Sequence, residues 1–483
     1  MVASVLRPDR PILYGLVIES LLLDCVAVSS SAKASHLPRE HRQAEYISLP
    51  VMDLAISKPL TLPCGLVLPN RLVKAAMAEQ MTSASKHHLP DEAFDAVYQT
   101  WAKGGWGMIL TGAVQIDPQF LNHPGDAALP SATPPTTLLT HSWHRWSSSA
   151  RGTTSTTSAP PPPIPIMQLT HADRHSPAAG MGIGGTRSPC TQTLAASAVP
   201  VRLGSGWLAA SVASAVFGTP RALGAPGETG AVAGRFAEAA RVAAEAGWGG
   251  VEVLAGGGGL LATFLSAESN HRTDAYGGSA RKRARMVVEV VEAIRKVTPE
   301  EGFCVGVKLD SADCQTGEAM EEAIEQIGAI LEAGIDFLEI SGGLYEDPWM
   351  MGGAGDEDEE ETSAREAFFL DFARSIRGHF PSLTLMVTGG FRTRLGMEAA
   401  IAGGGTDGTS ACDLVGIGRP AVLQPSAPRD VIFNPDVADE DARLREEKVE
   451  VPRWAKLSGI RAVGLGATSA WYSGQIRKLA KVK

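Results

Sequence analysis

The sequence predicts an α/β fold, a single (β/α)8 TIM barrel with an N-terminal extension and loop insertions. Short apolar runs alternate with amphipathic helices, the units number seven or eight, and no segment resembles a second domain. Strands that are apolar throughout need cover on both faces, so they should run parallel with helices between them. An open doubly wound sheet is the alternative. However, no early glycine-rich turn followed by an acid about 20 residues later stands out.

The expected strands follow one another through the middle of the chain. They are VKAAM (73–77), GMILTGAVQI (107–116), IPIMQL (164–169), VEVL (251–254), CVGVKL (304–309), DFLEISGG (336–343), LTLMVTGG (383–390) and CDLVGIGRP (412–420). The expected helices between the later strands are 233–247, 284–297, 319–334, 364–380 and 397–404. Gly247 suits the C-cap of the first helix, where a left-handed residue is needed.

Four stretches interrupt this alternation and set the expected boundaries. Residues 1–55 carry no sustained periodicity, so we expect a disordered N-terminal extension. Ser, Thr and Pro dominate about residues 130–165, which predicts a surface insertion because a proline run joins neither a helix nor a central strand. The acidic run 352–362 is expected to be a solvated loop. The barrel should therefore span 56–425, with a C-terminal extension over 426–483.

The composition is that of a globular protein and argues against some partners. Apolar residues make up 44% of the chain and the formal net charge is −10, whereas a nucleic-acid binder would show a basic face. The six cysteines are scattered, without CxxC or zinc-type histidine spacing, so no metal site is expected. Glu19 and Asp24 interrupt the one candidate targeting segment, 11–32, which is too short to span a bilayer. We expect a cytoplasmic protein that does not bind membranes; the oligomeric state is open.

The last two expected strands end in glycine-rich turns, TGGFRTR (388–394) and GIGRP (416–420). In (β/α)8 barrels, the loops after strands seven and eight often hold a phosphate. Glycines let backbone N–H groups approach an anion closely, and an arginine adds a bidentate contact. The predicted phosphate contacts are Gly389, Gly390, Gly418 and Arg419.

Two polar side chains end strands at the predicted barrel mouth. Lys308 ends CVGVKL, and a buried lysine needs a partner. That partner is either a cofactor anion or electron-rich ring, or a strand-end acid such as Asp310 or Glu339. Gln168 ends IPIMQL, and its amide can donate and accept hydrogen bonds as a flavin ring edge requires; ordinary loop hydrogen bonding is the alternative.

Nine segments add a more specific signal. They are LPNRLVKAAMAEQM (68–81), GGWGMILTGAVQI (104–116), MQLTHADR (167–174), FGTPRAL (217–223), FLSAESNHRTDAYGGSARKRAR (264–285), VGVKLDSAD (305–313), LEISGGLYE (338–346), VTGGFRTR (387–394) and VGIGRP (415–420). In content and order they resemble the old yellow enzyme family of FMN-dependent NADH:flavin oxidoreductases and ene-reductases. SAWYSGQI (469–476) resembles the C-termini of fungal-type members. The resemblance implies an oxidoreductase that uses FMN, takes hydride from NADH or NADPH, and reduces a small electrophile: an activated alkene, a quinone or oxygen.

The resemblance also implies particular cofactor contacts. Ala76 and Met77 would lie along the flavin ring, and Gly112 would lie beside its pyrimidine edge. Gln168 would hydrogen-bond that edge. Lys308 would face the ring atoms that become negative on reduction, where a cation stabilises the reduced flavin. The phosphate would contact the four residues already named for it.

The chain departs from the family pattern on the substrate side. Members usually carry a histidine, and a histidine or asparagine three residues later, that hold the substrate's carbonyl oxygen; a tyrosine two residues further supplies a proton. The alignment places Leu254 and Gly257 at the pair and Gly259 at the tyrosine, and none of their side chains can donate. The catalytic residues are therefore unknown, and a catalytically impaired flavin-binding barrel is the alternative function.

Three further polar residues fall on predicted mouth loops: His171, Tyr345 and Glu79. For each, a structural role is favoured over a catalytic one. Asp173 stands where the family usually has glycine, so the neighbouring His171 and Arg174 are expected to be displaced.

Overall fold

The computed structural model describes residues 50–130, 136–152, 161–179, 185, 187–204, 206–310, 317–341, 359–403, 408–450 and 461–481. All described residues belong to one compact unit, Ser48–Lys483. The expectations for residues 1–49, for most of the acidic run and for Tyr345 lie outside the described residues.

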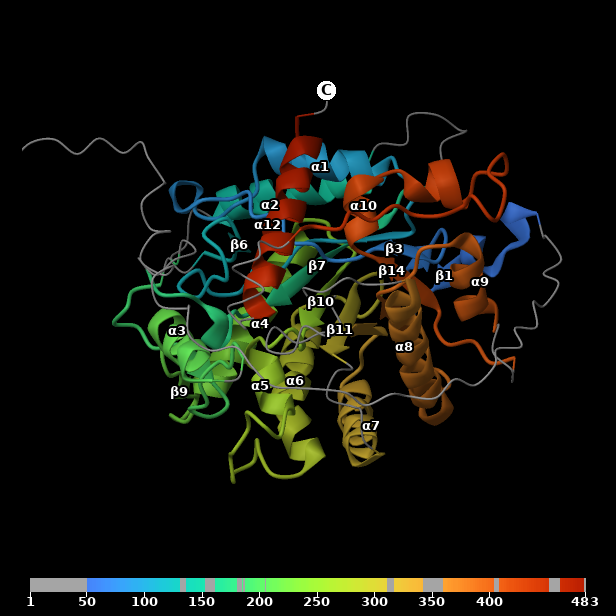
Figure 1. The fold of residues 1–483 in the computed structure, drawn as a ribbon. Helices are drawn as coiled ribbons and strands as arrows, with labels where there is room; N and C mark the ends of the chain where they lie inside the picture. Colours follow the sequence, from blue (N-terminus) through green and yellow to red (C-terminus); the bar gives the residue numbers. More distant parts are fainter. Residues whose placement is uncertain are drawn as a thin grey trace, which may run out of the picture. The chain divides into compact units, whose positions relative to one another are not determined.

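Eight parallel strands form a closed barrel within the described residues (Figure 1). In chain order they are β3 (Leu72–Lys74), β4 (Met108–Leu110), β7 (Ile164–Thr170), β10 (Gly250–Leu254), β11 (Cys304–Asp310), β12 (Phe337–Ser341), β13 (Leu385–Thr388) and β14 (Leu414–Ile417). Each pairs with the next, and β14 pairs with β3 with Gly416 opposite Val73, which closes the ring. The predicted barrel is confirmed, and every expected strand contains one of these eight or overlaps it.

A helix follows each barrel strand. These helices are α1 (Glu92–Ala102), α2 (Thr136–Arg151), α4 (Glu228–Glu245), α6 (Ala280–Arg295), α7 (Gly317–Glu332), α8 (Glu359–His379), α9 (Arg394–Ala402) and α12 (Arg461–Leu479). Helix α6 illustrates how the sequence specifies them. Its N-cap Ser279 accepts a hydrogen bond from the Lys282 amide, and Val287, Val291 and Ile294 bury one face at helical spacing.

Shorter elements lie between the barrel units. They are β1 (Leu60–Thr61), β2 (Val67–Leu68), β5 (Val114–Gln115), β6 (Ala127–Ala128), β8 (Leu194–Ala195), α3 (Trp207–Phe217), β9 (Arg221–Ala222), α5 (Leu260–Leu265) and α10 (Arg419–Leu423). No helix in the described ranges is both long and apolar enough to cross a membrane.

The barrel interior is apolar at one end and polar at the other. The apolar cluster is Leu62, Cys64, Leu68, Val73, Ala75, Met108, Leu110, Ile166, Cys304, Phe337, Met386 and Leu414. Several of these are the first residues of their strands, so the cluster fills the N-terminal end, where the antiparallel pair β1–β2 lies against it. One layer further along the strands, buried polar side chains replace it; they include Gln168, Glu252 and Glu339.

Residues 136–151 belong to the barrel, so the expected surface insertion over about 130–165 is wrong there. They form α2, and β7 already begins at Ile164. The buried positions of α2 recur every three or four residues: Leu139, Trp143, Trp146 and Ala150. Trp146 packs edge-on against Trp248, with ring centroids 4.9 Å apart. A composition rich in Ser and Thr concealed a helix with one strongly apolar face.

The described parts of the expected C-terminal extension, 426–450 and 461–481, pack onto the barrel. The Arg394 guanidinium, 2% exposed, donates to four backbone carbonyls and one carboxylate of this segment. Helix α12 contacts α1 and α10, and Ser473 on α12 donates to the Ala78 carbonyl at 2.8 Å. At the other end, the backbone amide of Ala55 donates to Glu398 at 2.9 Å and Leu54 is buried, so contacts with the barrel begin before residue 56.

Candidate functional site

The structure brings all the sequence-predicted cofactor residues to one end of the barrel. Gln168 and Lys308 lie in the C-terminal halves of β7 and β11, and the others immediately follow their strands. After β3 come Ala76 and Met77, after β4 Gly112, after β13 Gly389 and Gly390, and after β14 Gly418 and Arg419. Because all eight strands are parallel, these positions surround the same opening, where barrel enzymes place their sites.

Met77 lies between two glycines on this rim. A Cβ atom at Gly418 would lie 3.4 Å from the Met77 sulfur, and one at Gly112 would lie 2.6 Å from the Met77 carbonyl oxygen. The Gly112 amide donates to the Glu79 carboxylate at 2.8 Å, and the Tyr98 hydroxyl donates to the same oxygen. Glu79 therefore fixes the loop after β4, in agreement with its expected structural role. This part of the rim is formed largely by backbone, which a planar ring could approach closely.

A row of buried polar groups crosses the barrel below this rim. The Lys308 ammonium donates to Glu339 at 2.6 Å, and the Gln168 amide donates to Glu252 at 2.6 Å. The sequence left either a cofactor or a strand-end acid as the partner of Lys308, and in the structure the partner is the acid Glu339. Burial alone would lower the pKa of Lys308, but the charge of Glu339 and the hydrogen bond to it raise the pKa above its ordinary value, so this lysine is a cation. It meets the electrostatic requirement of a ring that becomes negative on reduction.

The turns after β13 and β14 fit an anion. Gly389 and Gly390 adopt positive φ angles of 138° and 79°. Within the described part of the chain, the backbone amides of Gly389, Gly390 and Gly418 make no hydrogen bond to another backbone group. Arg419 lies 2.8 Å from Glu446, which also pairs with Arg392, and its side chain is 32% exposed. Backbone amides without a backbone partner, together with a partly exposed guanidinium that follows Gly418 in the sequence, are suitable donors for a phosphate.

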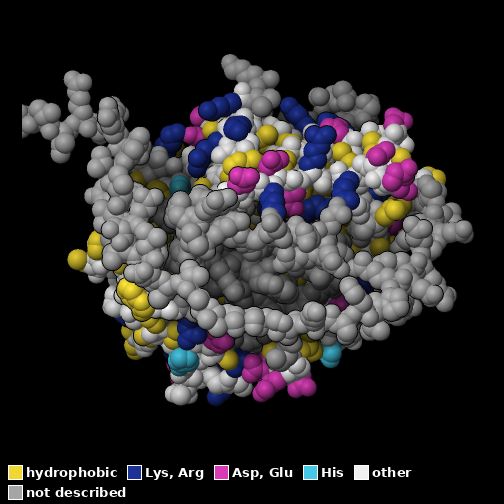
Figure 2. All heavy atoms as spheres, in the orientation of Figure 1, with side chains coloured by type: hydrophobic (Ala, Val, Ile, Leu, Met, Phe, Trp, Pro, Cys, Tyr) yellow, Lys and Arg dark blue, Asp and Glu magenta, His cyan; other side chains and the backbone are white. Residues whose placement is uncertain are grey.

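Many basic side chains lie on the surface around this end. Figure 2 shows Lys and Arg side chains, with some Asp and Glu among them, over the part of this face where α10 and α12 lie, although the whole chain carries a net charge of −10. Arg477 and Lys478 lie in the last turn of α12. These basic side chains favour the approach of anionic molecules.

The end of β10, where the family carries its donor pair, has only apolar side chains and glycines. Leu254 is half-buried, and Gly257 is exposed with φ 63° and no atom within 4 Å of a Cβ built on it. The Gly257 amide donates to the Asp310 carboxylate. A Cβ at Gly258 would lie 2.5 Å from the His175 ring. The loop is therefore packed against His175 at Gly258, whereas at Gly257 there is open space and no side chain to donate a hydrogen bond.

The two histidines near this loop are buried. Burial lowers the pKa of His171 to about 4 and that of His175 to about 3, so both are neutral at physiological pH. The His171 Nδ1 accepts a hydrogen bond from the Asp173 amide at 3.0 Å. Asp173 itself has φ 55°, the left-handed conformation that explains why glycine is usual at this position in the family.

Glu252 is the functional candidate that the sequence analysis missed, and Glu339 was considered only as a partner of Lys308. Both are 0% exposed. Each is the single acid in a mostly apolar strand, GVEVL or FLEIS. Because a charged side chain is costly to bury without a partner, that pattern was the available signal.

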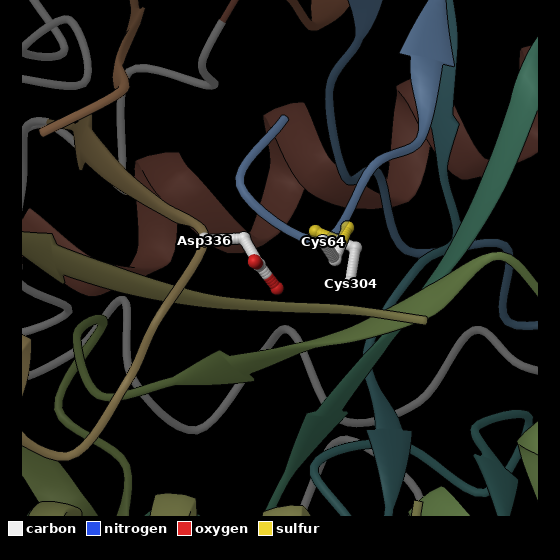
Figure 3. A group of neighbouring side chains, drawn as sticks. All are labelled: Cys64, Cys304 and Asp336. Atoms are coloured by element: carbon white, nitrogen blue, oxygen red, sulfur yellow. The ribbon is translucent and has the colours of Figure 1, made fainter. Parts of the chain in front are cut away.

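Three potential metal ligands meet at the opposite, N-terminal end of the barrel: Cys64, Cys304 and Asp336 (Figure 3). Their ligand atoms lie within 4.8 Å of one another and all three residues are buried. Asp336 already pairs with Arg295 at 2.6 Å, and burial raises the pKa of the Cys304 thiol well above its ordinary value. Since a guanidinium already balances the carboxylate and the thiol is held neutral, this cluster fits a cation poorly.

Comparison with known proteins gives consistent matches. The profile described as "NADH:flavin oxidoreductase / NADH oxidase family" matches residues 227–431. The NADH-dependent flavin oxidoreductase iccE of Talaromyces variabilis is 42% identical over 434 residues, covering 89% of this chain and 99% of that protein. The protein iliE of Hypocrea jecorina (strain QM6a), with the same description, is 38% identical over 416 residues, covering 86% and 98%. The iliE of Neonectria sp. (strain DH2) is 42% identical over 442 residues, but only 55% of that protein is covered.

Solved structures show the same fold. Morphinone reductase in complex with tetrahydroNAD superposes with a TM-score of 0.59 at 23% identity, covering 81% of this chain and 92% of that one. The old yellow enzyme homologue from Zymomonas mobilis gives a TM-score of 0.59 at 20% identity, covering 84% and 98%.

Proposed function

This chain belongs to the NADH:flavin oxidoreductase family, the old yellow enzymes, and from that premise we propose that it passes electrons from NAD(P)H through FMN to a quinone or to oxygen. The family confirms the expected enzyme class, the flavin cofactor and the nicotinamide reductant. The acceptor is the proposed part.

The residues at the barrel mouth support FMN as the bound group. When bound, FMN accepts hydride from NAD(P)H and returns the electrons to an acceptor. For the chain's own residues, we propose that Lys308 stabilises negative charge at the ring and that Gln168 hydrogen-bonds its polar edge. We further propose that Ala76, Met77 and Gly112 line the ring. The phosphate would contact Gly389, Gly390, Gly418 and Arg419.

The proposed acceptor depends on the residues at the end of β10. Reduction of an activated alkene needs donors on the substrate's carbonyl oxygen, and removing one such donor commonly costs about 10²–10³ in rate. Leu254, Gly257 and Gly259 offer no side-chain donor. A quinone or oxygen does not require a carbonyl clamp of that kind, so the apolar loop affects these acceptors less.

The test compares acceptors on one preparation. The protein is loaded with FMN, its visible spectrum is recorded, and NADH or NADPH oxidation is followed without oxygen in the presence of a benzoquinone or of cyclohexenone. Quinone turnover far above enone turnover supports the proposal, and equal or greater enone turnover refutes it. Flavin binding without NAD(P)H oxidation under any condition would support the alternative of a catalytically impaired flavin-binding barrel.

A further inference from the structure

Glu252 and Glu339 are two fully buried carboxyl groups in direct contact inside the barrel. Glu252 uses one oxygen to accept from Gln168 at 2.6 Å, and Glu339 uses one to accept from Lys308 at 2.6 Å. Their other oxygens, Glu252 Oε1 and Glu339 Oε2, are inaccessible to solvent and find no other donor of good geometry among the described residues. The two carboxyl groups interact directly, and each affects the pKa of the other.

The strand register explains how they meet. Glu252 pairs with Gly306 on the intervening strand β11, and Lys308 pairs with Glu339 on the far side of that strand. Gly306 has no side chain, and the Phe337 ring occupies the space that a Cβ there would need. Because Gly306 and Lys308 are two residues apart on β11, their register partners Glu252 and Glu339 point to the same face of the sheet.

Two carboxylates cannot hydrogen-bond to each other, because both only accept. The contact therefore requires one proton between them, as in other like-charged pairs held a few ångströms apart. Glu339 keeps its charge: burial opposes it, but Lys308 and the hydrogen bond from Glu252 hold the pKa of Glu339 below its ordinary value. Burial, and then the charge of Glu339, raise the pKa of Glu252 well above its ordinary value.

The groups that face Glu252 lie on three strands: Gln168 on β7, Lys308 on β11 and Glu339 on β12. Thr388 on β13 faces Glu339 from the other side. With Glu252 neutral, the negative charge of Glu339 balances the positive charge of Lys308, and the buried row has no net charge.

We propose that Glu252 and Glu339 share one proton and act as positioning residues that balance the charge of Lys308 and thereby set the reduction potential of the flavin. This rests on the proposed placement of FMN against Lys308. An ionised Glu252 would add a second negative charge beside the lysine and disfavour the reduced flavin. The shared proton prevents this second charge. The negative charge of Glu339 partly offsets the stabilisation of the reduced flavin by Lys308.

The shared proton is tested first, by infrared spectroscopy of the protein at neutral pH. The wild-type protein should show the C=O stretch of a protonated carboxylic acid, shifted in D₂O, and Glu252→Gln should lose it. This measurement needs no flavin turnover and can be made on the apoprotein. Absence of the band in the wild type would overturn the shared proton.

The effect on the flavin is tested by midpoint potentials of the FMN-loaded variants. Glu252→Gln keeps a neutral donor toward Glu339 and should leave the potential close to wild type. Glu252→Gln/Glu339→Gln removes the charge that balances Lys308 and leaves no carboxyl to replace it. Its reduced flavin should be bound at least tenfold more tightly relative to the oxidised form, a rise of about 30 mV for a two-electron couple.

A double variant that binds FMN with an unchanged potential would overturn the positioning role. Glu339→Gln alone should raise the midpoint potential less, because Glu252 can then ionise and pair with Lys308. A rise as large as that of the double variant would show that Glu252 does not compensate, and it would also count against the pair. None of these readouts depends on which acceptor the enzyme prefers, so failure of the quinone proposal would be seen separately.

Discussion

Arg394 offers a direct test of how the C-terminal segment is held on the barrel. Its buried guanidinium donates to the carbonyls of Val431, Ile432, Asn434 and Val437 at 2.8–2.9 Å and to Asp439 at 2.7 Å. Arg394→Met would leave these acceptors without their donor. Breaking a buried, hydrogen-bonded charge pair typically costs about 3–5 kcal/mol. Part of the segment is exposed and can be rehydrated, so we expect a loss near the lower end of that range.

The assay is urea unfolding followed by circular dichroism, with Arg429→Met as the matched control. Arg429 lies in the same segment but is half-exposed, and its ion pair with Asp430 should contribute no more than about 1 kcal/mol. Arg394→Lys should fall between the two, because one ammonium cannot reach all five acceptors. The segment continues to Glu446 beside Arg419, so Arg394→Met should also weaken FMN binding. Equal unfolding free energies for Arg394→Met and Arg429→Met would refute the reasoning.

Three further outcomes are expected. Arg419→Ala should weaken FMN binding, measured by quenching of flavin fluorescence, because a phosphate contact is lost. Glu446→Gln keeps the guanidinium and should change the affinity less. An unchanged affinity in Arg419→Ala would exclude the phosphate role. The folded protein holds His175 neutral down to a pKa of about 3, while the unfolded chain protonates it near 6.5, so its contribution to stability is complete above pH 6.5 and is lost as the pH falls toward 3. His175→Leu should therefore reduce the fall in melting temperature between pH 7 and pH 4, and parallel curves for the two proteins would contradict this. Leu254→His/Gly257→Asn should raise cyclohexenone reduction, since asparagine tolerates the φ of 63° at position 257 better than other residues do; no gain would mean that the loop cannot present the pair to a substrate.

Much of the fold was predictable because it is specified locally. Apolar strands, helical periodicity and glycine-rich strand ends are visible in short stretches of sequence, and they identified the barrel and the end at which the site lies. Helix α2 was missed because its Ser and Thr content outweighed four apolar residues at helical spacing. The C-terminal segment was treated as an extension because its attachment depends on Arg394, far from it in the sequence.

The sequence by itself determined which residues reach the barrel mouth, since residues after parallel strands necessarily meet at one end. It also determined that Leu254, Gly257 and Gly259 have no donor side chains. Only the tertiary structure decided the partner of Lys308, because strand register sets it opposite Glu339. The contact between Glu252 and Glu339 likewise spans a strand and depends on the registers of β10 and β12 against β11, a relation between three strands that no local pattern contains.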